Sequence, residues 1–442
     1  MSKGRTFRGG IHPIGHKELS ATKAIKVMTP PAEVIIPLKQ HVGACCKPLV
    51  KRGDIVNKGQ KIGDTDAFVS APIHAPVSGV VKAIESCWHP AGGKVQAIVI
   101  ENDNEERLDP SITPKGELDQ LDADAIKTIV REAGIVGLGG ATFPTHVKLA
   151  PPPDKRIQTL IINGCECEPY LTCDHRLMVE HPDRIIDGTR ALLKALGISK
   201  AIIGIELNKP DAIEAMQRAA VGHAGIEIVP LKLKYPQGAE RQLITAITGK
   251  EVPAGGLPMD IGIVVNNVGT AAAIQTAIQT GMPLIERIVT VSGEGVKEPQ
   301  NLLVRVGSRC SDVLEAAGGF TGTPKQVIIG GPLTGTTQFD LSVPVTKCTS
   351  GVLVFNQLKT AREPDPCIRC GRCVDVCPAF LVPTTIARYV DGGKLNEAVR
   401  WGLLNCIECG SCSYVCPANR FLVQSIKLGK QEVQAERHKK TS

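Results

Sequence analysis

Near its C-terminus the chain reads Cys367-Ile-Arg-Cys-Gly-Arg-Cys-Val-Asp-Val-Cys-Pro378 and then, after a short interval, Cys406-Ile-Glu-Cys-Gly-Ser-Cys-Ser-Tyr-Val-Cys-Pro417. Both runs have the spacing C-x-x-C-x-x-C-x-x-x-C-P. Gaps of two residues form tight turns, so the first three thiolates of a run can converge on one metal centre. The fourth Cys of each run, which precedes a proline, usually reaches a second centre.

This spacing is typical of bacterial ferredoxins that hold two [4Fe–4S] clusters. Zinc ligands come as two spaced pairs, often with His, and neither zinc nor a disulfide needs the fourth Cys-Pro. Because the last Cys of each run crosses over, the predicted ligands are Cys367, Cys370, Cys373 and Cys416 for cluster 1, and Cys406, Cys409, Cys412 and Cys377 for cluster 2. The runs therefore predict a protein that moves single electrons.

Length and composition limit the remaining possibilities. A chain of 442 residues with 43% hydrophobic residues can bury two to four domain cores. Aromatics make up only 3% and the net charge is +7, which argues against a nucleic-acid partner. The start of the chain leads into no apolar run, and no stretch approaches the roughly 20 apolar residues of a membrane span. With 16 Cys and no export signal, we expect reduced thiols in the cytosol.

Residues 1–118 show short β-branched runs separated by Gly, Pro and Asp, which predict strands and turns. The segments LVKRGDIVNKGQKIGD (49–64) and APVSGVVKAI (75–84) resemble the barrel–sandwich hybrid fold of lipoyl and biotinyl carriers. Those carriers attach their cofactor to a lysine at a hairpin tip. The matching turn here, near residues 64–68, has no lysine, so we expect a scaffold rather than a swinging arm.

Residues 119–284 alternate apolar strands with amphipathic helices, which predicts a Rossmann-like parallel sheet covered on both faces, within a multidomain α/β protein. Such sheets bind ligands at the carboxyl ends of their strands. One long helix is expected over 175–196. Residues 285–345 are strand-rich and resemble the β-grasp module that binds soluble ligands (SLBB), although we expect them to act as a small interdomain spacer. A linker over 358–366 leads into an α-helical ferredoxin domain within 358–426, and residues 427–442 read as a polar tail that forms a frayed helix.

A second group of motifs falls in the expected parallel-sheet domain. A glycine-rich turn, Gly137-Leu-Gly-Gly-Ala-Thr-Phe-Pro-Thr-His-Val-Lys148, lets the backbone approach a flat ring or a phosphate without a Cβ clash. One strand ends in Asn163-Gly-Cys-Glu-Cys-Glu-Pro169, and another in Val265-Asn266-Asn267 before a helix. Between them lies Tyr235-Pro-Gln-Gly-Ala-Glu240. Polar strand ends of this kind predict a ligand site.

In this order the motifs resemble the flavin- and NADH-binding subunit of respiratory complex I, with its G-R-G-G-A-G-F-P-T, N-A-D-E-x-E-P, Y-x-C-G-E-E and V-N-N-V-E-T patterns. The matching positions are Gly137, Gly139, Gly140, Phe143 and Lys148; Asn163, Glu166 and Glu168; Tyr235, Gly238 and Glu240; and Asn266, Asn267 and Thr270.

The resemblance implies that these residues hold FMN with NADH stacked above it, and that Glu166, Glu168 and Glu240 orient the nicotinamide or ribose. The chain departs from the pattern at Cys165, Ala239 and Gly269, where the family has acidic residues.

The full domain order, beginning with Gly9-Gly-Ile-His-Pro13, resembles the RnfC family of the Rnf electron-transport complex. Members of that family lie on the cytoplasmic face of the bacterial or archaeal inner membrane as peripheral subunits. The resemblance implies electron exchange between NADH and the complex through FMN and two [4Fe–4S] clusters, that is, ion-translocating ferredoxin:NAD⁺ oxidoreductase activity. The implied partners are the other Rnf subunits, including membrane subunits, and ferredoxin, directly or indirectly.

Two alternatives remain at this point. A cobalamin reductase uses similar flavin and cluster modules, but its glycine-rich motif lies near the N-terminus, whereas about 130 residues precede Gly137 here. The other alternative is a relay subunit without catalysis, in which the substitutions at Cys165 and Ala239 mark a vestigial flavin site. Tight FMN binding by the isolated chain would argue against it.

Overall fold

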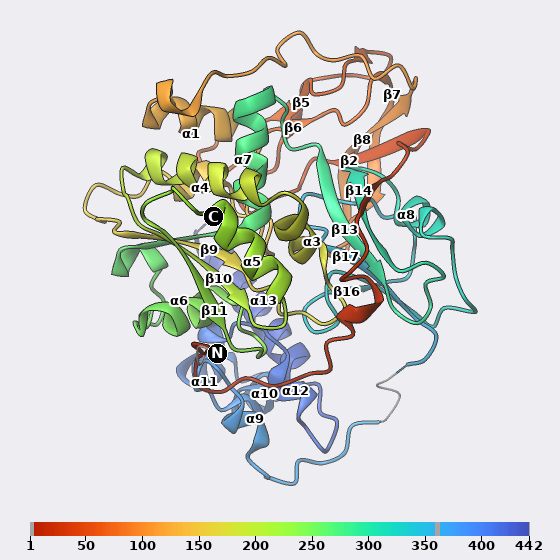
Figure 1. The fold of residues 1–442 in the computed structure, drawn as a ribbon. Coiled ribbons are helices and arrows are strands. Elements are labelled where there is room, and N and C mark those ends of the chain that lie inside the picture. Colours follow the sequence, from red (N-terminus) through yellow and green to blue (C-terminus); the bar gives the residue numbers. More distant parts are fainter. Residues whose placement is uncertain (1–3, 359–362, 442) are drawn as a thin grey trace.

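The structure is a computed structural model that describes residues 4–358 and 363–441 (Figure 1). Within these ranges the strands form four sheets, and the C-terminal part is helical. Part of the predicted linker, residues 359–362, lies outside the described residues, as does residue 442 of the predicted tail.

The central sheet is entirely parallel and has the order β11-β10-β9-β12. Its strands are β9 (Thr159–Gly164), β10 (Ala201–Glu206), β11 (Ile226–Leu231) and β12 (Ile263–Asn267). They are rich in Ile and Val, as expected for strands covered on both faces. The chain passes from β9 outward to β10 and β11, and then returns to place β12 on the other side of β9. The strand order therefore reverses between β9 and β12, where open α/β sheets bind ligands.

Helices cover both faces of this sheet (Figure 1). They are α1 (Ala123–Glu132), α3 (Cys173–Glu180), α4 (Pro182–Leu196), α5 (Pro210–Ala219), α6 (Glu240–Thr248) and α7 (Val268–Thr280), with the short α2 (Thr145–Lys148) after the glycine-rich turn.

The expected single helix over 175–196 is wrong, because α3 and α4 are separate. The chain breaks at His181, whose φ of −135° is not helical, and Pro182 begins α4. Proline has no N–H to donate and disfavours helical geometry in the residue before it, so it suits the first position of a helix.

The N-terminal part contains two small antiparallel sheets with the orders β2-β8-β7-β4 and β3-β5-β6. Their strands are β2 (Glu33–Pro37), β3 (Lys47–Pro48), β4 (Ile55–Val56), β5 (Lys61–Asp64), β6 (Ile73–His74), β7 (Gly79–Trp88) and β8 (Lys94–Asn102).

The turn that would carry a cofactor in lipoyl carriers is instead fixed to the central domain. Both carboxylate oxygens of Asp64 accept 2.8 Å hydrogen bonds from Arg131 on α1. Burial alone would raise the pKa of Asp64, but the bonds from Arg131, the Thr65 backbone and Lys61 lower it to about 2. These contacts support the scaffold interpretation of this domain.

A six-stranded sheet with the order β1-β14-β13-β17-β15-β16 follows the central domain. Its strands are β1 (Ile25–Val27), β13 (Glu286–Ser292), β14 (Gln300–Arg305), β15 (Gln326–Ile329), β16 (Thr336–Gln338) and β17 (Gly351–Phe355), and α8 (Cys310–Ala316) packs beside it. The sheet extends beyond the predicted range 285–345 at both ends. β17 supplies a fully buried central strand, and β1 comes from the N-terminus to pair in parallel with β14.

The first residues of the chain therefore lie outside the barrel-like sheets. Arg5 bridges to Leu231, Ile11 bridges to Tyr235, and the amide of Gly10 donates to the carbonyl of Val376. In Figure 1 this red segment runs between the central domain and the blue C-terminal domain. It contacts three parts of the molecule before the N-terminal sheets begin.

The C-terminal part consists of four short helices and one long helix around the cysteine runs. They are α9 (Arg372–Asp375), α10 (Pro383–Asp391), α11 (Leu395–Arg400), α12 (Ser411–Tyr414) and α13 (Leu422–Thr441). The tail from residue 427 is helical, as the frayed-helix prediction has it, and α13 continues through it from the C-terminal domain. Ile426 and Val433, two turns apart, join a core with Ile386 and Val390 of α10, and this packing holds the helix in place.

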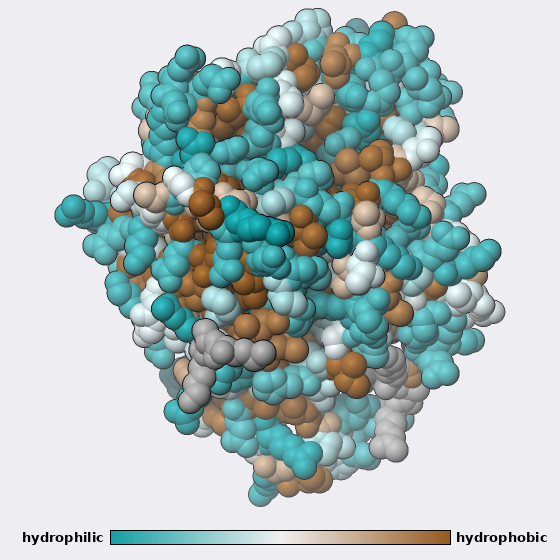
Figure 2. All heavy atoms as spheres, in the orientation of Figure 1, coloured by the Kyte–Doolittle hydropathy of each residue, from teal (hydrophilic) through white to brown (hydrophobic). Residues whose placement is uncertain are grey.

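Figure 2 shows that this face of the molecule is mostly hydrophilic, with hydrophobic residues in separate patches. Among the described residues, no helix combines the length and the apolar composition needed to cross a bilayer.

Gly188 provides a test of the packing between α4 and α7. A Cβ at this position would lie 1.8 Å from the carbonyl oxygen of Ala271, which is backbone and cannot move aside. We expect Gly188→Ala to lower the free energy of unfolding by about 3 kcal/mol, as overpacked cores do. Urea unfolding followed by circular dichroism measures it. Arg190→Ala on the same helix removes two partly exposed ion pairs, with Asp119 and Asp187, and should cost about 1 kcal/mol or less. Equal effects of the two substitutions on the free energy of unfolding would contradict the close contact between α4 and α7.

Candidate functional site

A cavity of about 540 Å³ lies at the point where the strand order of the central sheet reverses. Its wall includes seven of the predicted site residues: Gly139, Gly140, Asn163, Glu166, Glu168, Gly238 and Asn267. The other predicted residues are not part of this wall: Gly137, Phe143, Lys148, Tyr235, Glu240, Asn266 and Thr270. Four sequence motifs thus converge on one space.

The glycine-rich turn is closed at its base and open at its tip. The amide of Gly137 donates to the carbonyl of Phe143 at 2.9 Å, and the amide of Leu138 donates to the Thr270 hydroxyl at 3.0 Å. At the tip, Gly140 has φ +145°, and a Cβ there would meet no atom within 4 Å. The tip therefore presents bare backbone to the cavity, as a site for a flat ring or a phosphate requires.

The ends of β9 and β12 are linked by their asparagines. Asn163 donates to the carbonyl of Gly238 at 2.8 Å. Asn267 accepts from the amide of Gly269 at 2.7 Å, which caps α7, and donates to Asp174 at 2.7 Å.

Asn266 differs from both. Its side-chain amide is buried, and neither its oxygen nor its nitrogen has a hydrogen-bond partner among the described residues. Unlike Asn163 and Asn267, Asn266 does not line the cavity.

The three predicted carboxylates have different surroundings. Glu166, with φ +47°, accepts from the amides of Asp174 (2.7 Å) and His175 (3.3 Å) and so caps α3. Glu168 accepts from the Thr334 hydroxyl at 2.5 Å, and burial raises its pKa. Glu240 is 42% exposed and lies 3.4 Å from the ammonium of Lys148. Backbone amides of the described residues hold the carboxylates of Glu166 and Glu168, the latter through Leu333. They do not hold the carboxylate of Glu240.

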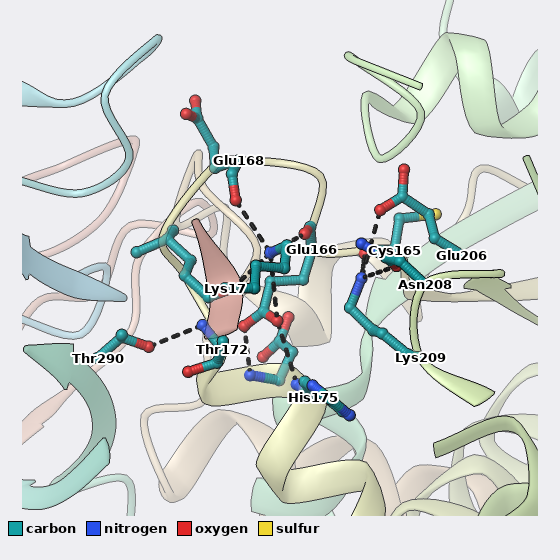
Figure 3. A network of polar contacts seen from close by, with 12 residues as sticks. Lys17, Cys165, Glu166, Glu168, Thr172, His175, Glu206, Asn208, Lys209 and Thr290 are labelled. Carbon is teal, nitrogen blue, oxygen red and sulfur yellow. Dashed lines mark hydrogen bonds and ion pairs between the residues drawn. The ribbon is translucent and has the colours of Figure 1, made fainter. Parts of the chain in front are cut away.

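Lysines that the sequence did not single out hold the loop 165–171, which follows β9 (Figure 3). Lys17, in the one-turn helix Lys17–Leu19, donates to the carbonyls of Glu166 (2.8 Å), Glu168 (3.0 Å) and Leu171, and lies 3.8 Å from the Glu166 carboxylate. Burial lowers the pKa of Lys17.

Lys209 holds the other side of the loop. It donates to the carbonyl of Cys165 at 2.6 Å and pairs with Glu206 at 3.3 Å, with both side chains fully buried. No motif in the sequence indicated either lysine, since each contacts the loop from a distant segment.

Asp174 lies between Glu166 and Asn267 at the cavity wall. Burial, and next the charge of Glu166, raises its pKa to about 6. The ligand atoms of Glu166, Cys173 and Asp174 lie within 4.8 Å of one another. Because backbone amides and Asn267 already occupy the two carboxylates, we interpret this group as the base of the cavity.

The turn between β15 and β16 forms another wall of the cavity, with Gly330, Gly331, Thr334 and Gly335. A Cβ on Gly331 would lie 2.3 Å from the Glu168 carboxyl, so glycine is needed for this close approach. The run GGPLTG at 330–335, with its three glycines, is the signal in the sequence for this close approach, and it lies within the range 285–345 of the β-grasp module.

The eight cysteines of the two runs separate into two groups in space. Cys367, Cys370, Cys373 and Cys416 line one cavity, and Cys377, Cys406, Cys409 and Cys412 line another. Each group joins three cysteines of one run to the last cysteine of the other, which is the grouping that a crossover of the last cysteines requires.

The second group adjoins the main cavity. Ile407 and Glu408, between two of its cysteines, lie in the cavity wall. The Tyr235 hydroxyl donates to the carbonyl of Cys409 at 2.8 Å and lies 3.4 Å from Glu168. One tyrosine therefore connects the site in the central domain to a cysteine loop of the C-terminal domain.

Comparisons with known proteins agree with this geometry. A family model for the Nuo51 FMN-binding domain matches residues 130–276, and one for the RnfC barrel–sandwich hybrid domain matches 5–105. Models for the SLBB domain and the 4Fe-4S dicluster domain match 288–337 and 359–417. The chain is 50% identical over 436 residues to the C subunit of the Na⁺-translocating ferredoxin:NAD⁺ oxidoreductase complex of Acetobacterium woodii, with 98% of each chain covered. The chain belongs to the RnfC family.

Further relatives and structures are consistent with this membership. The C subunit of the proton-translocating ferredoxin:NAD⁺ oxidoreductase complex of Clostridium ljungdahlii is 48% identical, covering 98% of this chain and 94% of the relative. An NAD⁺-reducing [NiFe]-hydrogenase in the air-oxidized state aligns with a TM-score of 0.51 at 23% identity, over 71% of this chain and 67% of the other. The latter shows a shared fold only.

Family membership confirms the electron-transfer function predicted from the cysteine runs and the flavin-like motifs. The RnfC chain is an electron-transfer subunit of an Rnf complex, with domains of the FMN-binding and 4Fe-4S dicluster families. The four family models show a multidomain chain with barrel–sandwich hybrid, FMN-binding, SLBB and 4Fe-4S dicluster domains. Its relatives at 50% and 48% identity are Rnf subunits, so the cobalamin reductase alternative is not retained.

Lys17 allows a test of the loop after β9. We expect Lys17→Met to weaken FMN binding roughly tenfold, because three loop carbonyls lose their common donor in a buried place. Quenching of FMN fluorescence on titration with the apoprotein measures the dissociation constant. Lys23→Met, which removes an exposed bond to Pro299 from the same segment, is the control and should change it less than about twofold. A normal FMN affinity in Lys17→Met would show that the loop holds without its lysine.

Asp174 predicts a pH dependence of stability. Its pKa is about 6 in the folded chain and about 4 when unfolded, so the folded state binds the proton more tightly. This contribution is complete below about pH 4 and is lost as pH rises through about 6. Between about pH 5.5 and 7.5 the wild type should therefore lose about 1 kcal/mol of stability relative to Asp174→Asn. Urea unfolding at several pH values measures the difference. Asp183→Asn, at an exposed position, is the control. If the wild type and Asp174→Asn show the same dependence of stability on pH, the raised pKa of Asp174 is disproved.

Proposed function

We propose that this RnfC subunit exchanges electrons between NADH and the rest of its complex through FMN and two [4Fe–4S] clusters. It would act as a ferredoxin:NAD⁺ oxidoreductase component, with ferredoxin a direct or indirect partner. Its place would be peripheral, on the cytoplasmic face of the membrane that holds the other subunits. The names of its relatives, which mention ferredoxin and NAD⁺, support this interpretation.

One observation carries the proposal. The main cavity is shared by the flavin-type motifs and by a cysteine loop, since Gly140 and Asn267 form one part of its wall and Ile407 and Glu408 another. A redox group held at the glycine-rich turn would therefore lie against the second cysteine group. Electron transfer requires that the two redox groups lie close together, and the shared cavity would bring them together.

The proposed roles of the residues follow from their surroundings. When bound, FMN accepts a hydride from NADH and releases single electrons, which iron–sulfur clusters carry one at a time. The backbone of Gly139 and Gly140, which line the cavity, would support the ring. Glu240, which keeps an accessible carboxylate, is better placed than Glu166 to contact a nucleotide.

The positions of the two cysteine groups imply an order. Cys406, Cys409, Cys412 and Cys377 would hold the cluster nearer the flavin, and Cys367, Cys370, Cys373 and Cys416 the one nearer the surface. Tyr235 fixes the near group to the central domain through the carbonyl of Cys409. Electrons would then pass from the main cavity to the near group, from there to the outer group, and on to a partner.

The relay alternative rests on the substitutions at Cys165 and Ala239. The Cys165 thiol points toward the carbonyl of Gly204, 3.8 Å away, and does not line the cavity. The cavity side of this motif instead carries Glu166 and Cys167. The substitution at Cys165 therefore leaves the cavity wall unchanged, which favours a working flavin site over a vestigial one.

The decisive experiment is an anaerobic spectrum of the cluster-reconstituted chain with FMN, before and after NADH. We expect bleaching of both the flavin band and the broad iron–sulfur absorption. If FMN and iron are bound and neither band responds, NADH is not the direct donor and the relay alternative holds.

Two Cys variants test the order of the clusters. In Cys367→Ser, which removes an outer ligand, NADH should still reduce the near cluster. In Cys406→Ser, which removes a near ligand, NADH should bleach the flavin. The outer cluster should then take roughly ten times longer, or more, to be reduced than in the wild type. Electron paramagnetic resonance of the remaining cluster distinguishes the two cases, and iron analysis confirms which cluster is lost. Equal reduction of the remaining cluster in both variants would reject the order.

A further inference from the structure

The two cysteine runs form loops of the same conformation, so their positions can be compared one by one. Arg369 and Glu408 have φ of +56° and +57°, and Gly371 and Gly410 have φ of +80° and +77°. A short helix follows in each case, α9 and α12. We call residues 367–372 the outer loop and residues 406–411 the inner loop.

The inner loop is covered by the rest of the chain. Ile407 and Glu408 line the main cavity, and the carbonyl of Cys409 accepts from Tyr235. A Cβ on Gly410 would lie 3.1 Å from the carbonyl of Leu333, on the β15–β16 turn. Through this face the inner cysteine group contacts the cavity that the flavin-type motifs line.

The outer loop is bare at the same positions. Ile368, the counterpart of Ile407, is 67% exposed, and a Cβ on Gly371 would meet no described atom within 4 Å. Cys367 and Cys370 are themselves exposed. A face that the inner loop uses for contact is therefore left open in the outer loop, with an apolar side chain at its centre.

The charge of the two loops is opposite. Arg369 stands where the inner loop has Glu408, and Arg372 where it has the buried Ser411. The cavity of about 410 Å³ beside the outer cysteines is also lined by Arg388 and Arg420, and no carboxylate is among the described residues of its wall. Arg420 lies 3.5 Å from Asp391, whereas Arg369 and Arg372 make no ion pair with any described residue.

We propose that the outer loop docks onto an acidic face of another subunit of the complex, one that carries its own one-electron centre. Ile368 would be the apolar anchor and Arg369 and Arg372 the charged rim, which guides association and fixes orientation. The role in electron transfer rests on the proposed function. The binding itself does not, because it can be measured without NADH or turnover.

Charge alone offers a competing explanation. A cluster with four thiolate ligands is an anion, and the arginines could simply balance its charge. In that case their removal would change the reduction potential of the outer cluster and leave partner binding unaltered. Binding and potential must therefore be measured on the same variants.

The test titrates the reconstituted chain onto membranes that hold the remaining subunits and lack this one. For the Arg369→Glu/Arg372→Glu variant we expect at least roughly tenfold weaker binding at about 0.05 M salt, and a difference that shrinks at about 0.5 M as charges are screened. Ile368→Ser should weaken binding by a similar factor at both salt concentrations, since apolar contact is not screened. Arg218→Glu, an exposed arginine on α5, is the control.

Three further readouts make the result decisive. Iron content shows whether each variant keeps its clusters, a redox titration gives the outer potential, and NADH bleaching reports the internal path. Weaker, salt-dependent binding with normal iron and normal NADH bleaching supports the docking loop. Unchanged binding overturns it, with or without a shifted potential. Failure of NADH bleaching in the wild type would reject the proposed function and leave the binding result to be judged separately.

Discussion

The loop after β9 depends on buried lysines, and much of the site depends on that loop. Lys17 and Lys209 each place an ammonium group away from water, where it must find several acceptors. The acceptors are the carbonyls of residues 165–171, so the backbone there is held in one shape. With the loop fixed, Glu166 caps α3 and Glu168 meets the β15–β16 turn. Loss of either cation would leave buried carbonyls and carboxylates without a partner.

The same constraint brings distant domains together. Lys17 belongs to the N-terminal segment, which also pairs with β11 and with the C-terminal domain. Glu168 contacts Thr334 from the β-grasp sheet and lies near Tyr235, which reaches the inner cysteine loop. Four parts of the chain contribute to the cavity wall: the central domain, the turn between β15 and β16, the inner cysteine loop, and Pro90 and Ala91 between β7 and β8.

Several features could be predicted from the sequence because they are local or periodic. The spacing of the cysteines limits which thiolates can converge, and the groups Cys367/Cys416 and Cys377/Cys406 are found together in space. The four strands of the central sheet have alternating helices between them and could be placed because their apolar runs are short and bounded by polar residues. The break at Pro182 was missed, although proline at a helix start is a local signal that outweighs a continuous apolar pattern.

Other features could not be predicted because they depend on contacts between remote residues. β1 joins the β-grasp sheet by pairing with β14, and no pattern in three exposed or half-buried residues could indicate that partner. Lys17 reads as an ordinary surface lysine in the sequence. The polar residues after 427 read as a frayed helix, and the sequence could not show that Ile426 and Val433 pack α13 against α10.

The sequence by itself determined which cysteines come together in space and which motifs supply the wall of the main cavity. These are properties of spacing and residue type along the chain. Only the tertiary structure decided which cysteine loop faces the cavity and which faces solvent, because the two runs are nearly identical. Their difference arises from what packs against each one, Leu333 and Tyr235 at Gly410 and Cys409, and no described atom at Gly371.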